Sequence, residues 1–243
     1  MAYRVFQIAR NALPVRASLR PGMGYGEARI SAKPVCMRGR NADWSMEDYL
    51  GRKQGLIVAG CDEVGRGAFA FNLVVAACAY DCAIEPSCDI RDSKALTAAE
   101  REQLADLLTR EFVAKGLLHI AYAEASASEV ETSNLNALNL RLFKEALQEL
   151  PHFDRVIIDG TIADNTFPGL CAPRADETSI TVATASIFAK VRRDRQMREL
   201  HAQYPQYGFD QHVGYGTKLH VEAIRKFGPI PGVHRKNFLR NLA

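Results

Sequence analysis

The feature that most constrains the fold of this 243-residue chain is an alternation of short apolar runs with longer stretches of helical periodicity. Ile, Val and Leu are prominent in the short runs, which is typical of strands buried on both faces. We expect strands at residues 56–61, 69–80, 117–123 and 156–159. We expect helices at residues 101–115, 135–150, 180–203 and 217–227. Strands interleaved with helices indicate an α/β domain with a mixed sheet.

Local signals mark where some of these helices begin and end. Thr97 and Glu100 have the spacing of a capping box just ahead of the first helix. Leucines recur at helical spacing through the second helix, which Pro151 ends. Gly228 follows the last helix and has the position of a C-terminal cap.

Residues 1–45 differ in composition from the rest of the chain. They are rich in arginine, contain only two acids, are broken by three prolines and show no lasting apolar period. We therefore expect residues 1–45 to be a poorly ordered basic extension and residues 46–243 to form the folded domain. The extension is either an organelle-targeting segment, which is typically Arg-rich and acid-poor, or translated sequence upstream of the true start. Met46 favours the second alternative, because a more convincing domain begins there.

Charge is distributed unevenly along the chain. The net charge of +3 combines +6 over residues 1–54, −10 over residues 55–187 and +7 over residues 188–243. An acidic centre between basic ends suits an enzyme that holds metal ions among carboxylates and grips a polyanion nearby. A chance distribution of surface charge explains the balance equally well when charge is considered alone.

Other features of the composition exclude several classes of protein. No apolar stretch approaches the ~20 residues of a membrane-spanning helix, and no secretory signal is recognisable. The six cysteines include no C-x-x-C pair, which argues against a zinc site. We expect a soluble cytoplasmic protein with free thiols and no membrane partner. The alternative location is an organelle, if residues 1–45 are a targeting segment.

Carboxylates come directly after two of the expected strands. Asp62 and Glu63 follow the first strand and precede Gly65-Arg66-Gly67, while Asp159 closes the fourth. Adjacent acids at the end of an apolar strand are costly unless a cation balances them. Ligands bind at this edge of open α/β sheets. The alternative interpretation is a solvated turn for Asp62 and Glu63, and a capping or turn role for the Asp159-Gly160 pair.

Asp176 lies in a loop just ahead of the long helix at residues 180–203, where a helix N-terminal role is the alternative. Together with the three acids above it could complete an all-oxygen site. Carboxylates and water are the ligands that hard cations such as Mg²⁺ or Mn²⁺ prefer. The expected metal site therefore consists of Asp62, Glu63, Asp159 and Asp176.

A series of motifs runs along residues 56–238 in a fixed order. They are Gly60-Cys61-Asp62-Glu63-Val64-Gly65-Arg66-Gly67, Asp92-Ser93-Lys94, Asp159-Gly160, Ala185-Ser186-Ile187-Phe188-Ala189-Lys190-Val191 with Arg193-Asp194, Tyr207-Gly208-Phe209, His212-Val213-Gly214-Tyr215-Gly216-Thr217 and His234-Arg235. Motif by motif, the chain resembles the ribonuclease HII family.

This resemblance implies an RNase H-like fold, with a mixed five-stranded sheet flanked by helices and a small C-terminal helical portion. It implies an endonuclease that hydrolyses the RNA strand of RNA–DNA hybrids and cuts 5′ of single ribonucleotides in duplex DNA, leaving 3′-hydroxyl and 5′-phosphate ends. The four acids would be catalytic carboxylates that hold two Mg²⁺ or Mn²⁺ ions, so that no protein nucleophile is needed. We expect a monomer whose partners are these two kinds of duplex.

The resemblance also implies which residues contact the substrate. The Gly65-Arg66-Gly67 turn would present its backbone to the ribose 2′-hydroxyl, and Tyr215 would stack on the adjoining deoxyribose. Lys94 and Lys190 would contact phosphates as point charges. Without the motifs, both lysines would be read as ordinary surface side chains, and Tyr215 as a turn aromatic.

The chain departs from the family pattern at three places. Phe71-Asn72 stands where Gly-Pro is usual, Thr161 where Asn is usual, and Ala183 where a small hydroxyl residue is usual. No departure removes a carboxylate, so we expect activity. The first lies close to the Gly65-Arg66-Gly67 turn and so bears on substrate fit.

Three other functions are weighed against this interpretation. A ribonuclease HIII type tends to lack Arg66 and to carry an added N-terminal binding domain, for which this N-terminus is too short. A non-catalytic nucleic-acid-binding subunit should have lost a carboxylate, yet all four are present. A DNA-cutting nuclease is distinguished by testing an all-DNA duplex beside the hybrid.

Overall fold

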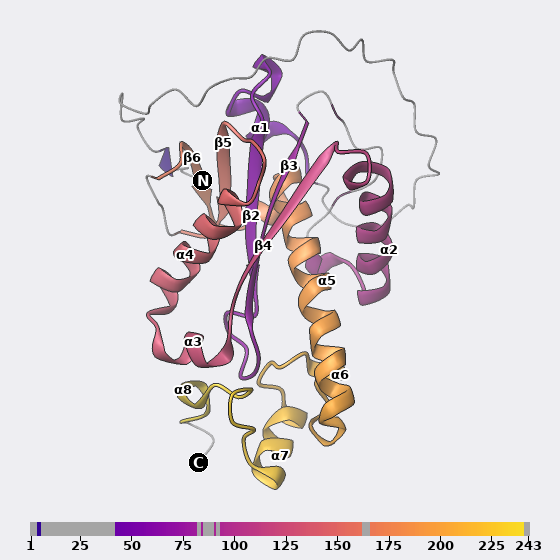
Figure 1. Cartoon of the computed structure of the whole chain (residues 1–243), viewed down its shortest axis with the longest axis vertical. Coiled ribbons are helices and arrows are strands. Elements are labelled where there is room, and N and C mark those ends of the chain that lie inside the picture. Colours follow the sequence, from indigo (N-terminus) through magenta and orange to yellow (C-terminus); the bar gives the residue numbers. More distant parts are fainter. Residues whose placement is uncertain are drawn as a thin grey trace.

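The computed structural model describes residues 4–5, 42–81, 84, 90, 93–161 and 166–240. A mixed sheet with the strand order β1-β6-β5-β2-β3-β4 forms its centre (Figure 1). The strands are β1 (Arg4–Val5), β2 (Val58–Val64), β3 (Leu73–Tyr80), β4 (Leu118–Ala125), β5 (Arg155–Asp159) and β6 (Gly169–Ala172). The α-helices are α1 (Ser45–Tyr49), α2 (Ala98–Leu108), α3 (Ala127–Thr132), α4 (Leu135–Gln148), α5 (Ile180–Gln203), α6 (Phe209–His212), α7 (Lys218–Phe227) and α8 (Lys236–Leu239). Strands β2 to β6 form the expected mixed five-stranded sheet, which the two-residue β1 extends at the β6 edge.

Strand β2 lies inside the sheet and pairs in opposite senses with its two neighbours. It runs parallel to β5, with Cys61 opposite Ile158, and antiparallel to β3. The antiparallel pairing with β3 continues to Val64, beyond the last residue pair with β5. Asp62 and Glu63 therefore lie within the carboxyl end of β2, and not after the strand as the sequence suggested.

Helices cover both faces of the sheet (Figure 1). Strand β3 is buried along its whole length, and its alternate residues serve opposite faces. Ala76 and Cys78 pack with α2 and α5, whereas Val75 and Ala77 pack with α4. Because both faces are covered, the strand reads in the sequence as an uninterrupted apolar run.

Helix α5 approaches β2 closely because Gly60 has no side chain. A Cβ atom at Gly60 would lie 2.3 Å from the main-chain carbon of Thr181. Ala183 and Ala185 are fully buried further along the same helix. This close packing allows Ser186 of α5 to form a hydrogen bond with Asp62 at the carboxyl end of β2.

A separate small core holds the C-terminal segment against the end of α5. It joins Met197 and Leu200 of α5 to Phe209 of α6 and Ile224 of α7, with Ala70 from the segment between β2 and β3. Figure 1 shows these short helices gathered beyond one end of the sheet. The expected C-terminal helical portion is thus confirmed, and it has a core of its own.

Several predicted elements are present with shifted ends. The capping box of Thr97 and Glu100 forms with both hydrogen bonds, and α2 continues beyond Leu108 as a π-helix, Thr109–Val113. The expected strand at 69–80 begins only at Leu73, because the residues before it bond to the C-terminal segment. Phe69 N, for example, donates to Gly214 O at 2.8 Å.

The sequence did not predict α1, α3 or β6. Each of these has six residues or fewer, which is too short to display an apolar period. Within the described residues, no helix combines the length and the apolarity that a membrane-spanning segment needs.

The expected boundary between extension and domain falls at Met46, but the preceding residues already contact the domain. Ala42 is buried in the core shared by α2 and α5. The Trp44 ring meets the Tyr80 ring edge-on, with centroids 5.6 Å apart. Residues 42–45 therefore pack with the domain. Apart from β1, the rest of the extension lies outside the described residues.

Candidate active site

A cavity of about 310 Å³ opens where the carboxyl ends of β2 and β5 lie side by side. Of the residues that the sequence singled out as the site, all except Asp176 line it. Ser93, Arg101 and Ser186 also line the cavity and were not predicted. Asp92 of the same motif as Ser93 lies outside the described residues.

Asp62 is the most deeply buried carboxylate of the cavity wall, with 6% of its surface exposed. Burial raises its pKa well above the usual range, and the nearby carboxylates of Asp159 and Glu63 raise the pKa further. A hydrogen bond from Ser186 opposes the shift. In this environment the charged form of Asp62 lacks a compensating cation.

The surroundings of the Glu63 carboxylate have opposing effects on its pKa. Burial raises its pKa, while a hydrogen bond with Asn139 and the charge of Arg66 lower it. Arg66 Nη1 lies 3.7 Å from Glu63 Oε1. Glu63 Oε2 is buried and has no hydrogen-bond partner among the described residues, so an acceptor remains open on the buried side.

Asp159 occupies the end of β5, beside Asp62 on the neighbouring parallel strand. Its Oδ1 accepts a hydrogen bond from Ala175 N at 2.7 Å. Burial, followed by the charge of Asp176, raises the pKa of Asp159 to about 6. The strand register therefore brings two carboxylates together that lie 97 positions apart in the sequence.

Asp176 lies in the 3₁₀ turn Ala175–Glu177 that precedes α5, and it is fully buried. Its Oδ2 accepts a hydrogen bond from Lys94 Nζ at 2.7 Å, while its Oδ1 has no partner among the described residues. The Lys94 side chain is 74% exposed. The exposed ammonium group of Lys94 thus covers the buried Asp176 carboxylate. The charge of Asp176 also raises the pKa of Asp159 and of Asp62.

The donor chemistry of these four acids fits divalent cations. Their oxygens are hard ligands, two buried oxygens lack hydrogen-bond partners among the described residues, and neighbouring carboxylates raise the pKa of Asp62 and of Asp159. Within the described residues, no three acid, histidine or cysteine side chains are already gathered as a metal-binding group. The Lys94 ammonium group already pairs with Asp176, at the carboxylate that a bound metal ion would also contact.

Two fully buried arginines hold the Gly65-Arg66-Gly67 turn and the segment that follows it. Arg235 Nη1 donates to Gly65 O at 2.7 Å and to Ala68 O at 3.0 Å. The Arg193 guanidinium donates to three main-chain oxygens, those of Ala70, Asn72 and Val213. Gly65 has a φ of +91°, and a Cβ atom there would lie 2.3 Å from Arg193 Nε. Both arginines belong to the motifs quoted above, but the sequence shows only their charge.

Tyr215 lines the same cavity as the turn. Its half-buried ring lies 5.6 Å from the Arg193 guanidinium and 6.0 Å from Lys190 Nζ. The main chain beside it is fixed to the segment after the turn, because Gly214 O accepts hydrogen bonds from Phe69 N and Ala70 N. The turn and Tyr215 are thus parts of one connected wall.

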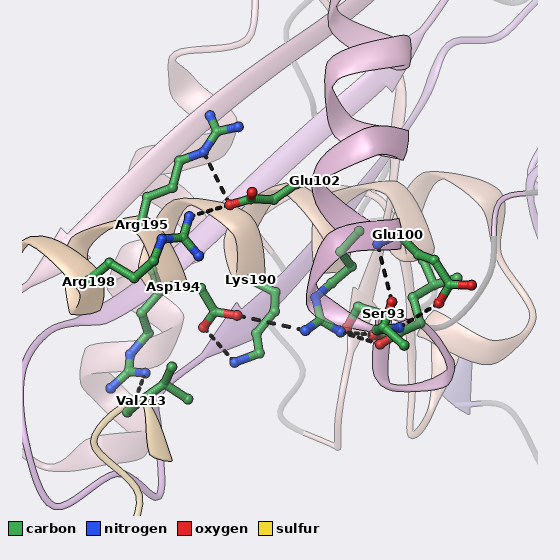
Figure 2. A network of polar contacts seen from close by, with 12 residues as sticks. Ser93, Glu100, Glu102, Lys190, Asp194, Arg195, Arg198 and Val213 are labelled. Atoms are coloured by element: carbon green, nitrogen blue, oxygen red, sulfur yellow. Dashed lines mark hydrogen bonds and ion pairs between the residues drawn. The ribbon is translucent and has the colours of Figure 1, made fainter. Parts of the chain in front are cut away.

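Lys190 projects from α5 and is held by an ion pair within its own helix. Its Nζ lies 2.6 Å from Asp194 Oδ1, and Figure 2 shows the two side chains together. The other oxygen of Asp194 lies 3.7 Å from Arg101 Nη2. Arg101 also donates to the main-chain oxygens of Ser93 and Leu96. This network fixes the segment that carries Lys94 relative to Lys190.

Comparison with known proteins identifies the chain. The family model "Ribonuclease HII" matches residues 59–241. The chain belongs to the ribonuclease HII family. It is 44% identical over 187 residues to the ribonuclease HII of Thermus thermophilus, covering 76% of this chain and 88% of that one. It is 38% identical over 192 residues to the ribonuclease HII of Fusobacterium nucleatum, covering 76% and 86%.

Solved structures show the same fold. The ribonuclease H2 of Pyrococcus horikoshii superposes with a TM-score of 0.63 at 25% identity and covers 77% of this chain and 97% of that one. A Bst ribonuclease HIII solved in complex with Mn²⁺ superposes with a TM-score of 0.58 at 19% identity, covering 77% and 69%. The RNase H-like fold expected from the motifs is therefore confirmed.

Membership of the ribonuclease HII family shows the activity. Ribonuclease HII is an endonuclease that cleaves RNA in RNA–DNA hybrids and single ribonucleotides embedded in DNA. The alternatives of a ribonuclease HIII type and a non-catalytic subunit are set aside by the same matches.

Phe71, one of the residues that depart from the usual family pattern, has an unusual backbone conformation. Phe71 has a φ of +72°, in the left-handed region that glycine adopts without strain and where the family usually has Gly. Its ring packs into the C-terminal core, and its carbonyl accepts hydrogen bonds from Arg235 Nε and Nη2. The chain therefore keeps the backbone geometry of a glycine position with a bulky residue.

Proposed function

We propose that Asp62, Glu63, Asp159 and Asp176 are the catalytic carboxylates of this ribonuclease HII and hold Mg²⁺ or Mn²⁺. The observation that supports this most directly is the register of β2 and β5, which puts Asp62 and Asp159 side by side at one cavity. Burial and the charges of neighbouring carboxylates raise the pKa of both. Buried acids with raised pKa values cluster at functional sites, which supports this assignment.

The bound cations would lower the pKa of a water molecule and stabilise the charge on the leaving 3′-oxygen. The chain's own contribution is to hold the carboxylates in place. Ala175 N orients Asp159 through a 2.7 Å hydrogen bond, and Ser186 orients Asp62. Lys94 pairs with Asp176 and is 74% exposed, so a cation at Asp176 would release its ammonium group toward a phosphate.

Lys190 is the second phosphate contact that we propose. Burial lowers its pKa, and its pairing with Asp194 opposes the shift. The lysine lines the cavity but is tied to its own helix at 2.6 Å. A phosphate would therefore meet an ammonium group that is already fixed in position. Such a group would orient the phosphate as well as attract it.

We assign discrimination between RNA and DNA to the Gly65-Arg66-Gly67 turn and to Tyr215, which both line the cavity. Nothing lies within 4 Å of a Cβ atom built on Gly67, so a sugar has room to approach the backbone of the turn. A site that hydrogen-bonds a substrate hydroxyl discriminates by ~10⁴ or more against the analogue that lacks it. Tyr215, which lines the same cavity, would pack against the next sugar, where an absent 2′-hydroxyl leaves room. Together they read a 5′-RNA–DNA-3′ junction.

The decisive experiment uses a DNA duplex with one embedded ribonucleotide. It is incubated with the full chain, with and without Mg²⁺ or Mn²⁺, and the cut positions are mapped. We expect a single cut on the 5′ side of the ribonucleotide, with 3′-hydroxyl and 5′-phosphate ends and only in the presence of the cation. An all-DNA duplex should remain intact, and cutting of that duplex would identify a general DNA nuclease instead.

Carboxylate variants test the assigned site within the same assay. Asp62→Asn, Glu63→Gln and Asp159→Asn should each lower turnover by at least ~10²–10³, because charge at the scissile phosphate is stabilised through the cations. Asp106→Asn is the matched control, since the Asp106 side chain is 68% exposed on α2. A near-normal rate for Asp62→Asn at saturating metal would contradict the proposal.

A further inference from the structure

Three histidines lie buried in the C-terminal core, outside the carboxylate site. His212, His220 and His234 are 5%, 0% and 3% exposed. The rings of His212 and His220 are stacked with centroids 4.2 Å apart, and His220 Nε2 lies 3.1 Å from His234 Nε2. No role in the proposed reaction has been given to them.

The partners of these rings fix where each proton sits. Ile230 N donates to His234 Nδ1 at 2.8 Å, so the proton of neutral His234 is on Nε2. His220 Nδ1 lies 2.9 Å from Tyr215 O, which can only accept, so Nδ1 of His220 carries its proton and Nε2 is bare. The bare Nε2 of His220 therefore accepts from Nε2 of His234.

One directed chain of hydrogen bonds results, from Ile230 N–H through His234 and His220 to Tyr215 O. We call it the histidine relay. His212 has an equally defined proton, because Gly214 N donates to its Nδ1 and its Nε2 lies 2.8 Å from Tyr207 O. Each ring has a complete set of partners only while it is neutral.

The relay ends on the residue proposed to read the junction. Tyr215 O accepts from His220 Nδ1 and also from Thr217 N at 2.8 Å, so both of its lone pairs are used. Tyr215 N donates to His212 O at 2.9 Å. The main chain of Tyr215 is therefore bonded at both ends to the histidine cluster.

We infer that His220 and His234 are positioning residues, and that the neutral relay sets where the Tyr215 ring stands in the cavity. This inference rests on the proposed role of Tyr215 in junction recognition. Loss of the relay is expected to impair cutting at a single ribonucleotide more than cutting within a long RNA–DNA hybrid, because the latter needs no junction.

The surroundings of the relay favour the neutral rings. Burial, together with the smaller effect of neighbouring histidines, lowers the pKa of His220 and of His234 to about 4. An extra proton on His220 would put two N–H groups face to face across 3.1 Å, and one on His234 would put its Nδ1–H against Ile230 N–H at 2.8 Å. The relay is therefore intact at neutral pH and is lost as the pH falls through about 4.

Few ionisable groups surround the rings. His212 stacks on His220, the Tyr207 ring lies 5.3 Å from that of His234, and Asp210 and His201 act on His212. Arg235, next in sequence to His234, directs its guanidinium to main-chain oxygens of residues 65–71 instead. No carboxylate is among the causes that act on His220 or His234.

The test compares turnover on two substrates, a DNA duplex with one ribonucleotide and a long RNA–DNA hybrid. The same carboxylates cut both, so the ratio of the two rates cancels effects on catalysis and on metal binding. His220→Phe keeps a ring but removes both hydrogen bonds of His220. It should lower the junction-to-hybrid ratio about fivefold, the effect of losing the one bond that reaches Tyr215 O. His220→Asn keeps a donor toward Tyr215 O and should lose less.

Controls separate this inference from the proposed function. His119→Asn, on exposed β4 surface, should leave the ratio unchanged. If Tyr215→Ala lowers the ratio and His220→Phe does not, the relay has no positioning role, although Tyr215 still reads the junction. If Tyr215→Ala leaves the ratio unchanged, the proposed role of Tyr215 fails and the inference falls with it. If His220→Phe does not fold, His234→Asn replaces it, because it keeps an acceptor for Ile230 N–H.

A spectroscopic measurement tests the relay in the unaltered protein. Side-chain ¹⁵N–¹H NMR at pH 7 should show His220 protonated on Nδ1, and His234 and His212 on Nε2. Titration should leave His220 and His234 neutral down to a pH near 4. A charged ring at pH 7, or the opposite tautomer of His220, would overturn the inference.

Discussion

At the scale of single residues, the acids of the site oppose the stability of the fold. Burial and the charge of Asp176 raise the pKa of Asp159 from an ordinary value of 3.8 to about 6. A carboxyl whose pKa is higher in the folded state binds more protons there, so it lowers stability as the pH rises from about 4 through 6. A cation bound to the folded state reverses this cost.

We therefore predict that Asp159→Asn raises the free energy of unfolding at pH 7 by about 1 kcal/mol when no divalent cation is present. The amide keeps an oxygen that accepts from Ala175 N, but it removes the charge. The gain should disappear near pH 4, where Asp159 is protonated, and Mg²⁺ should stabilise the wild-type chain more than the variant. Urea unfolding at the two pH values measures this, and a variant less stable than wild type at pH 7 would contradict it.

Phe71 offers a second prediction at the same scale. Its φ of +72° strains any residue with a Cβ atom, while its ring contributes to the C-terminal core. Phe71→Ala loses the packing and keeps the strain, whereas Phe71→Gly loses the packing and relieves the strain. We expect the Gly variant to be more stable than the Ala variant by about 1 kcal/mol in thermal or urea unfolding. The usual order, with Ala more stable than Gly, would show that the backbone relaxes.

At the scale of elements, the C-terminal segment and the turn after β2 depend on each other. Arg193 and Arg235 are fully buried, and within the described residues their hydrogen bonds all end on main-chain oxygens. Burial lowers the pKa of Arg235 to about 10, so it is still charged at neutral pH. A buried charge that is spread over several carbonyls makes their positions hard to change separately.

Alanine substitutions at the two glycines of the turn test whether the turn and the C-terminal segment depend on each other. Gly65→Ala introduces a Cβ atom 2.3 Å from Arg193 Nε and 2.8 Å from Asn72 O, at a φ of +91°. It should cost about 1–3 kcal/mol of stability. Gly67→Ala meets nothing within 4 Å and should be nearly neutral in stability, although the methyl group would obstruct a sugar at the turn. Equal stability of the two variants would show that Arg193 yields to the added atom.

At the scale of the whole molecule, the basic N-terminal residues meet the domain at residues 42–45. The Trp44 ring packs on Tyr80, and the Arg52 guanidinium lies 4.3 Å from the Trp44 ring. A chain beginning at Met46 should still fold and keep most activity, but it should be about 1–2 kcal/mol less stable than one beginning at Ala42. Urea unfolding of the two chains measures the difference. Equal stabilities would return the domain boundary to Met46.

The charge of residues 1–41 gives a further expectation for the same two truncated chains. Both lack seven arginines and Lys33. Relative to the full chain, both should bind duplex more weakly, and the logarithm of affinity should fall less steeply with the logarithm of salt concentration. An unchanged slope would mean that the extension does not contact the duplex.

The sequence by itself determined the elements and the chemistry. Apolar runs and helical periods predicted the main strands and helices, and the capping box of Thr97 and Glu100 marked the start of α2 as observed. Motif order predicted the family, which the comparisons confirmed. These properties are local, because an apolar run, a helix cap or a motif depends only on residues that are close in the sequence.

The tertiary structure alone decided which distant groups meet. The pairing of β2 with β5 sets Asp62 beside Asp159, and the close contact at Gly60 brings Ser186 to Asp62. Arg193 and Arg235 look like surface charges in the sequence, yet both are buried against main-chain oxygens. Every residue has a backbone carbonyl that can accept a hydrogen bond, so the pattern of side chains in the sequence does not predict which carbonyl these arginines contact. For the same reason the histidine relay, which begins and ends on the main chain, became visible only in the folded protein.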